Sequence, residues 1–427
     1  MTRKTKLAIA FLLTLSLLFA IPILVFKANG RAELNAALAE AKRAGFPLTI
    51  EDAYGKGVRS QKDSSNFFKN IPDEQTQKVV SQLEKVLAAT PGPGVGSEIL
   101  SSVSSYFEHL EQAATLPDFT PQRDWSLGPD LTFPEYSNIK YGVRALCARA
   151  LFRARNNNTK GAIQDTERAV VLANLPGQEN ILIAKLVAIA CDAIIEVSAS
   201  KLASECQKDT GFLEALLQCV SKIKLPTTKE CVKTELFSGI TITNMVRDSK
   251  LDTWQLTFFD SSHSSYSPSV LEKIKMVRMM WSLDYQEADY IRRMVHMHAV
   301  WGDEQKMKQL EADIPADSLS GLILPVMSQL VTAEKRAKAY NLASRIAISA
   351  TALRAKNGAW PTLEVAAKSI NVPIGDPFSS GHLGYLPSVN GLAVFSVGPN
   401  GVDNQAEKTK SHNIDDITIQ IKPTGIK

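Results

Sequence analysis

The feature that most constrains the fold is a change of pattern near residue 357, where a long helical periodicity gives way to short, turn-bounded segments. Small and apolar side chains recur at helical spacing before it, at Ala343, Ile346, Ala347, Ala350 and Leu353. Asn357-Gly358 then supplies the left-handed residue that favours a helix end. We therefore expect a helix to end there and a small, separate unit to follow.

This C-terminal unit carries the pattern of a short antiparallel sheet. Two apolar runs, Leu383 to Leu386 and Leu392 to Val397, are separated by Asn390-Gly391, which is typical of a β-hairpin. A last alternating segment spans residues 417–421. The long helix and these strands predict a small α+β cap over residues 326–427.

The order of motifs in the cap resembles the C-terminal part of the type II secretion major pseudopilins. It runs as a helix, Asn-Gly-x-Trp-Pro, Asp-Pro-Phe, Tyr, Phe-Ser-Val-Gly-Pro-Asn-Gly-Val-Asp and Asp-Asp-Ile. The tail is also similar to that of mostly uncharacterised membrane-anchored proteins of planctomycete-type bacteria. The resemblance covers roughly the last fifth of the chain and implies a pseudopilin-like cap.

In the pseudopilins the corresponding loop binds calcium, so the resemblance implies a calcium site here. Asn400 stands where an aspartate is usual, Val402 would offer its carbonyl, and Asp415 and Asp416 match the closing acidic pair. Asp403 adds a further carboxylate, and calcium prefers such oxygen ligands. The alternative interpretation is that these Asn and Asp side chains serve turn and cap geometry.

The N-terminus carries the pattern of a membrane anchor. The basic residues Arg3, Lys4 and Lys6 come first and should stay in the cytoplasm. An uncharged apolar run from Leu7 to Phe26 follows, about the length that crosses a bilayer as a helix. A cleaved signal peptide is the alternative, but residues 26–30 form a poor small-x-small cleavage site. We predict a single-pass anchor in a bacterial inner membrane, with the bulk of the chain extracytoplasmic.

Length and composition describe an ordinary globular protein of several domains. The chain has 427 residues, of which 44% are hydrophobic and 22% charged, and a formal net charge of +4 with both signs mixed. No basic stripe points to nucleic acid as a partner. The pattern divides the chain into an anchor, a region of helices and linkers, a helical domain and the cap, at residues 1–30, 31–136, 137–325 and 326–427.

Helical patterns dominate the middle of the chain and predict a mainly α fold. Tyr141 to Arg155 and Lys160 to Asn174 form a helix, a turn and a helix. Small and large residues fall where tetratricopeptide-type helix pairs place them, at Leu146, Ala150, Ala162 and Ala169. The resemblance is partial, because Arg153 and Thr166 occupy positions that are usually aromatic. Without a fixed 34-residue period, we expect an irregular array of helix pairs.

The five cysteines give no metal or redox motif. Cys147 and Cys191 sit in apolar helical runs and are expected in the core. Cys206, Cys219 and Cys231 are near enough in sequence for one disulfide in an extracytoplasmic domain.

No catalytic motif appears in the sequence. His296 and His298 are two residues apart and point in different directions on a helix, which does not suit one metal ion. A Gly-x-Ser-x-Gly elbow is absent. We therefore predict a non-enzymatic protein.

These features together predict a membrane-anchored extracytoplasmic binding or scaffold protein. Its partner would be a protein, and its site of action would lie near a secretion or pilus-like envelope assembly. Two alternatives stay open: an envelope hydrolase with an unrecognised site, because catalytic geometry need not be local in sequence, and a purely structural protein.

Overall fold

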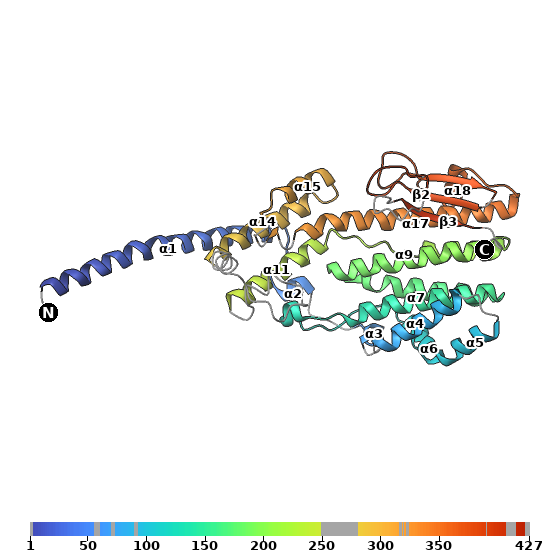
Figure 1. Ribbon diagram of the computed structural model, residues 1–427, viewed down its shortest axis with the longest axis horizontal. Coiled ribbons are helices and arrows are strands. Elements are labelled where there is room, and N and C mark those ends of the chain that lie inside the picture. The colour runs from blue at the N-terminus through green and yellow to red at the C-terminus, as the bar shows by residue number, and fades with distance from the viewer. Residues whose placement is uncertain are drawn as a thin grey trace. The chain divides into compact units, whose positions relative to one another are not determined.

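The described residues are mainly helical and form a three-stranded antiparallel sheet near the C-terminus, as Figure 1 shows for the computed structural model. The structure describes residues 3–54, 60–69, 73–88, 93–248, 281–315, 318, 320–321, 324–389, 391–406 and 416–422. Two compact units share the chain, and each is discontinuous in sequence. Unit 1 comprises Met1–Lys56, Asp124–Asp130 and Lys229–Gln329, and unit 2 comprises Gly57–Arg123, Leu131–Thr228 and Leu330–Lys427.

Unit 1 is built on one long helix, α1 (Arg3–Arg43), which packs along α14 (Leu283–Ala299). Helix α14 also packs against α11 (Cys231–Arg247). Leu34, Ala37 and Ala41 recur at helical spacing and are buried, so they form the packed face of α1. The unit is completed by α2 (Ile50–Tyr54), the 3₁₀ turn η1 (Trp125–Asp130) and α15 (Glu304–Ala312).

The predicted anchor, Leu7 to Phe26, forms part of α1, but the side chains of residues 3–20 lie outside the described part of the structure. Among the described residues, no helix is both long and apolar enough to cross a membrane.

The core of unit 2 is a set of four helices connected by short turns: α7 (Pro134–Arg155), α8 (Thr159–Asn174), α9 (Leu182–Glu205) and α10 (Thr210–Ser221). The predicted helix, turn and helix are confirmed in α7 and α8. Asn157 takes the left-handed conformation at φ 59°, and the Asn158 side chain caps α8 by accepting from the Gly161 N–H. Helix α7 begins earlier than predicted because Pro134, at its first turn, is favourable there.

A second layer of shorter helices covers α7: α3 (Ser65–Lys69), α4 (Asp73–Ala88), α5 (Pro93–Ser102) and α6 (Ser104–Ala113). Helices and linkers were expected over residues 31–136, and α5 begins within this region at Pro93. Gly96 is buried in this helix, and a Cβ there would overlap the Phe152 ring. The glycine therefore serves close packing.

The cap follows the predicted order. Helix α17 (Pro325–Asn357) ends where expected, and Gly358 has φ 79°. Strands β1 (Gly384–Ser388), β2 (Gly391–Ser396) and β3 (Ile417–Ile421) pair antiparallel in that order. The sequence did not predict α18 (Leu363–Lys368), which begins at the capping residue Thr362.

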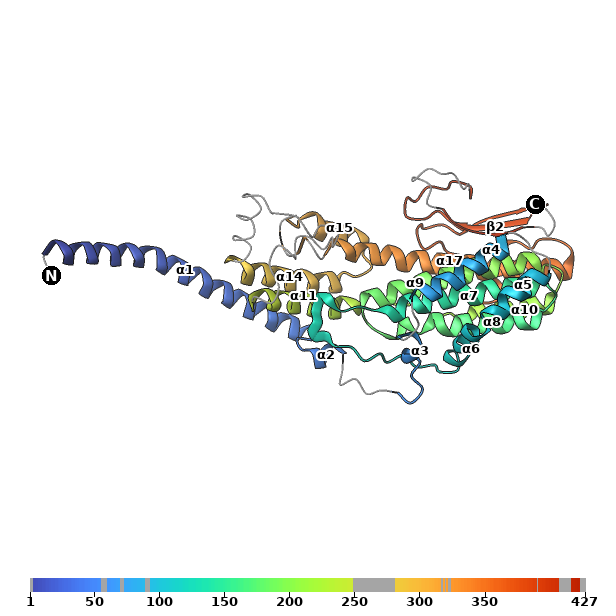
Figure 2. The same cartoon turned by 60° about the horizontal axis from the view of Figure 1, so that its bottom comes forward.

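Side-chain hydrogen bonds hold the cap together and join it to α9. Ser349 on α17 donates to the Ala366 carbonyl at 2.9 Å and so holds α18 against α17. The Lys422 N–H, directly after β3, donates to Ser204 on α9 at 3.0 Å. Figures 1 and 2 show α17, α9 and α7 running alongside one another in this unit.

Candidate functional site

The loop after β2 contains the residues predicted to bind calcium. Asn400 accepts from the Val402 N–H at 2.9 Å, and Asp403 accepts from the Gln405 N–H at 2.7 Å. Both contacts are local turns of the kind that Asn and Asp side chains form without a metal. For these two residues the geometry therefore agrees with the turn interpretation, while Val402 is exposed and Asp415 lies outside the described residues.

Asp416, the residue before β3, behaves differently because its side chain bonds to the loop backbone. Its Oδ2 accepts from the N–H groups of Asn404 at 3.2 Å and Ala406 at 3.1 Å. Its Oδ1 is buried and has no hydrogen-bond partner in the described structure, and the same is true of Asn404 Oδ1. Two unsatisfied hard oxygens in one loop are chemically suited to a calcium ion.

The electrostatics around Asp416 also favour a cation. Partial burial raises the pKa of Asp416, the nearby charges of Asp403 and Asp376 raise it further, and the two backbone N–H groups oppose the rise. A bound cation would relieve this unfavourable charge. No three His, Cys, Asp or Glu side chains gather for a metal in the described residues, which leave out Asp415. Asn404, which the sequence analysis missed, has no signal beyond its place in the loop.

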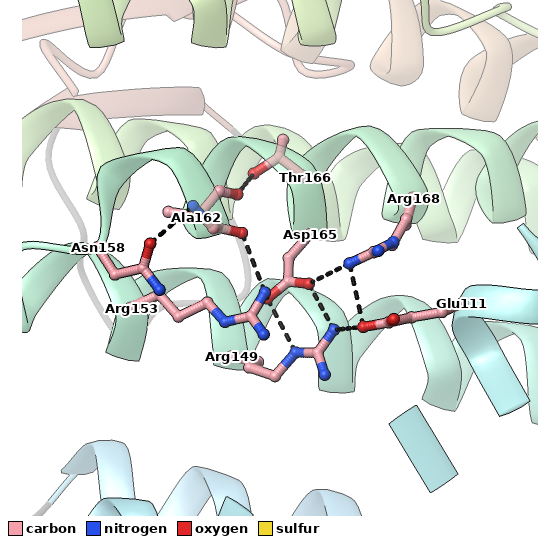
Figure 3. A network of polar contacts seen from close by, with 9 residues as sticks. Glu111, Arg149, Arg153, Asn158, Ala162, Asp165, Thr166 and Arg168 are labelled. Carbon is pink, nitrogen blue, oxygen red and sulfur yellow. Dashed lines mark hydrogen bonds and ion pairs between the residues drawn. The ribbon is translucent and has the colours of Figure 1, made fainter. Parts of the chain in front are cut away.

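A network of three arginines and two carboxylates joins α6, α7 and α8 (Figure 3). Asp165 on α8 is fully buried and accepts two hydrogen bonds from Arg149, at 2.9 and 2.6 Å. Arg153 lies 2.9 Å from Asp165, and Glu111 pairs with Arg149 at 2.7 Å and Arg168 at 3.0 Å. The Arg149 guanidinium also lies 3.9 Å from the centre of the Phe107 ring.

This network explains why the helix pair departs from the tetratricopeptide pattern. Arg153, at a position that is usually aromatic, donates to the Gly161 carbonyl at 3.2 Å besides pairing with Asp165. Thr166, at the second such position, donates to the Ala162 carbonyl at 2.9 Å. At Arg153, polar contacts between α7 and α8 thus replace aromatic packing, whereas Thr166 bonds within α8. The geometry of the network suits a structural role.

A buried pair of carboxyl groups lies on α9. Asp192 and Glu196 are one helical turn apart and at most 1% exposed, and none of their four carboxyl oxygens has a hydrogen-bond partner among the described residues. Burial raises the pKa of both groups, and Asp192 raises that of Glu196 further. The Asn341 side chain on α17 opposes the rise at Glu196. Both groups are therefore neutral over an extended pH range.

An open groove of about 390 Å³ lies between α7 and α9. Most of its lining is apolar and includes Cys147, Leu151, Ile194 and Val197. Arg144 and Lys201 are the two cations in the lining. Burial raises the pKa of the Cys147 thiol to about 12, so this cysteine is an apolar floor residue and not a nucleophile. The groove, hereafter the α7–α9 groove, was not predicted because its walls come from two separate helices.

The outer face of α9 extends this groove as an apolar stripe. Ile183, Leu186 and Val197 are 45%, 37% and 38% exposed. They share a face with Ala190 and Ile194, because positions three, four or seven apart recur on one side of a helix. The described residues therefore leave a row of aliphatic side chains in contact with solvent.

The predicted disulfide among Cys206, Cys219 and Cys231 is not formed, and the two core cysteines form no disulfide either. His298 pairs with Glu230 at 3.4 Å and packs edge-on against Phe46. Burial lowers the pKa of His298, and the hydrogen bond with Glu230 opposes this fall. The contacts of His298 with Glu230 and Phe46 are therefore structural.

Comparison with known proteins gives no relative. No protein family, no curated protein and no solved structure matches this chain.

Proposed function

We propose that the chain is a membrane-anchored extracytoplasmic binding protein whose α7–α9 groove receives a protein partner. The observation that carries this proposal is the exposed apolar stripe of α9 running into an open groove. Aliphatic side chains at Ile183, Leu186 and Val197 gain most when a partner removes them from water.

The groove's shape and charge define the partner segment. From residue 183 to residue 197 the stripe is roughly 21 Å long, at about 1.5 Å per residue, which matches four turns of a second helix. Lys201 lines the groove, and its charge favours a carboxylate. The occupant is therefore an amphipathic helical segment of another protein, with aliphatic side chains along one face and an acidic group at the Lys201 end.

The N-terminal anchor and the calcium-binding cap belong to the same proposal. The uncharged run from Leu7 to Phe26 would place unit 2 outside the cytoplasm of a bacterial cell. Calcium held by Asp416 and Asn404, with the remaining predicted loop residues, would stabilise the cap because the ion binds only the folded loop. A cap of this kind near a secretion or pilus-like assembly would present the groove to its partner.

Site-specific photo-cross-linking in intact cells tests the groove. A photoreactive amino acid at Val197 should cross-link to a distinct partner, and Lys201→Glu should weaken that product because it reverses a groove charge. The matched control is Val365 on α18, a valine of comparable exposure outside the groove. The partner peptide, mapped by mass spectrometry, should be helical and carry an acidic residue.

Two results would contradict the groove as a binding site. One is the same set of products from Val197 and Val365, which would mean that exposure alone decides cross-linking. The other is a cross-link from Val197 to this chain itself, which would mean that one of its own segments covers the stripe.

A further inference from the structure

A pocket of about 230 Å³ lies within unit 1, between α1, α11 and α14. Basic and aromatic side chains line most of it: Lys27, Arg31, Arg247, Phe26, Trp281 and Tyr285. This composition differs from that of the α7–α9 groove, because three cations and three aromatic side chains make up most of the lining.

The charges of the pocket do not balance. Three cations line it against one carboxylate, Asp284. Arg247 lies 2.9 Å from Asp284 and also pairs with Glu287, so its charge is used within the fold. Arg31 is 3.9 Å from the same Asp284 oxygen, and Lys27 forms no ion pair with any residue the structure describes. Positive charge therefore remains available to an anion.

Aromatic contacts hold the pocket's walls in place. The rings of Phe26 and Tyr285 are 4.8 Å apart, and the Tyr285 hydroxyl donates to the Phe26 carbonyl at 3.3 Å. Gly30 admits this ring, because a Cβ there would lie 3.0 Å from it. Lys27 lies 5.7 Å from the centre of the Trp281 ring, which is 48% exposed.

The pocket begins where the apolar run ends. Phe26 is the last residue of that run, and the residues before it expose aliphatic side chains: Ile21, Ile23, Leu24 and Val25. Lys27 and Arg31 lie about 6 Å apart along α1, at about 1.5 Å per residue, which is comparable with the thickness of a lipid headgroup layer. Tryptophan, tyrosine and basic residues are favoured at this level of a membrane.

We propose that this pocket binds the phosphate of an anionic phospholipid headgroup. Lys27 and Arg31 neutralise the phosphate, Trp281 and Tyr285 lie at the glycerol level, and the acyl chains lie against the exposed aliphatic residues of α1. The inference rests on the proposed membrane anchor and adds a specific lipid contact to it. Since α1 packs along α14, the lipid would fix unit 1 at the membrane surface.

Native mass spectrometry of the full-length protein in mild detergent tests the pocket. The probes are dihexanoyl phosphatidylglycerol, dihexanoyl phosphatidylcholine and inorganic phosphate. Wild-type protein should bind the phosphatidylglycerol in preference to the other two. The double variant Lys27→Gln, Arg31→Gln should bind it about thirtyfold more weakly, because two cations at the phosphate are lost. The control Lys42→Gln, Arg43→Gln removes two exposed cations from the same helix and should bind as wild type.

Equal binding of the two lipids, or equal affinity of the two double variants, overturns the proposal. Displacement of phosphatidylglycerol by an equal concentration of inorganic phosphate also overturns it, because the site would then serve a free anion. Carbonate extraction of cells separates the hypothesis of a lipid-binding pocket from the hypothesis of a membrane anchor. A protein that stays in the membrane without lipid preference contradicts the pocket alone, whereas a protein that is extracted contradicts the anchor and the pocket together.

Discussion

Arg149 on α7 donates two hydrogen bonds to the fully buried Asp165 on α8, with Nε to Oδ2 at 2.9 Å and Nη2 to Oδ1 at 2.6 Å. This two-point contact fixes the angle between the guanidinium and the carboxylate. Because Arg153 and Arg168 also approach Asp165, one carboxylate organises three cations between the helices.

Replacing Asp165 with alanine should destabilise the α7–α8 pair by about 3 to 5 kcal/mol, because it leaves buried arginine charge without its acceptor. Native-state hydrogen exchange of the α7 and α8 amides measures this in the full-length protein. The control is Glu205→Ala, which removes a partly exposed ion pair with Arg155 and should cost less than about 1 kcal/mol. Similar losses in both variants would show that Asp165 has no special role.

The carboxyl pair on α9 should make stability depend on pH. The fold raises the pKa of Asp192 and Glu196, so it favours their neutral forms. This contribution is complete below the ordinary carboxyl pKa and is lost as pH rises through the raised values in the folded protein. The variants Asp192→Asn and Glu196→Gln cannot ionise, so each should be more stable than wild type at alkaline pH, by the order of 1 kcal/mol.

Thermal unfolding between about pH 5 and pH 9 measures this effect. Glu214→Gln on α10 is the matched control, because its carboxyl group is exposed and should leave the pH dependence unchanged. If the stability of wild-type protein changed with pH in parallel with that of the two α9 variants, the raised pKa values of Asp192 and Glu196 would be contradicted.

Calcium should stabilise the cap through Asp416. In the full-length protein, calcium at about 100 times its dissociation constant should raise the free energy of unfolding by about 2.7 kcal/mol, because the ion binds the folded loop alone. Asp416→Asn and Asn404→Ala should each reduce this gain. The first removes a negative charge from the loop, and the second removes an otherwise unsatisfied oxygen.

Thermal melts with calcium and with excess chelator provide the measurement. Glu364→Gln, an exposed acidic residue of the same cap, should keep the full calcium response. An unchanged melting midpoint of wild-type protein in chelator would leave turn geometry as the role of the Asn and Asp residues.

Gly239 on α11 should not tolerate a side chain. A Cβ at this position would overlap the ring of the fully buried Tyr290 on α14, whose hydroxyl donates to the Glu235 carbonyl at 2.9 Å. Gly239→Ala should therefore destabilise unit 1 by about 1 to 3 kcal/mol. Gly211→Ala on α10 is the control, because its Cβ would meet its nearest neighbour at 3.6 Å and alanine favours helix. Hydrogen exchange of α11 and α14 compares the two variants, and equal protection would refute the clash.

Local patterns predicted much of the secondary structure. The end of α17 at Asn357-Gly358, the hairpin around Gly391 and the strand at residues 417–421 are confirmed, because each depends on backbone preferences of neighbouring residues. The same reasoning missed α18 and the early start of α5, where short helices carry too few turns for a clear periodicity.

The candidate sites were harder to predict. The loop was located by its Asn and Asp residues, yet Asn400 and Asp403 form local turns while Asp416 and Asn404 carry the unsatisfied oxygens. In a sequence, a turn-forming carboxylate and a metal-binding one look alike, because only the surrounding backbone decides which oxygens remain without partners.

By itself, the sequence determined the mainly helical class, the helix pair α7–α8 and the order of elements in the cap, because periodicity and turn residues act over a few positions. Tertiary structure alone decided which polar residues were buried and which apolar residues were exposed. Asp165 meets Arg149, Asp192 is buried beside Glu196, and Val197 stays in solvent, because each outcome depends on the helix packed against that face. Contacts between residues far apart in sequence thus define both the α7–α9 groove and the pocket of unit 1.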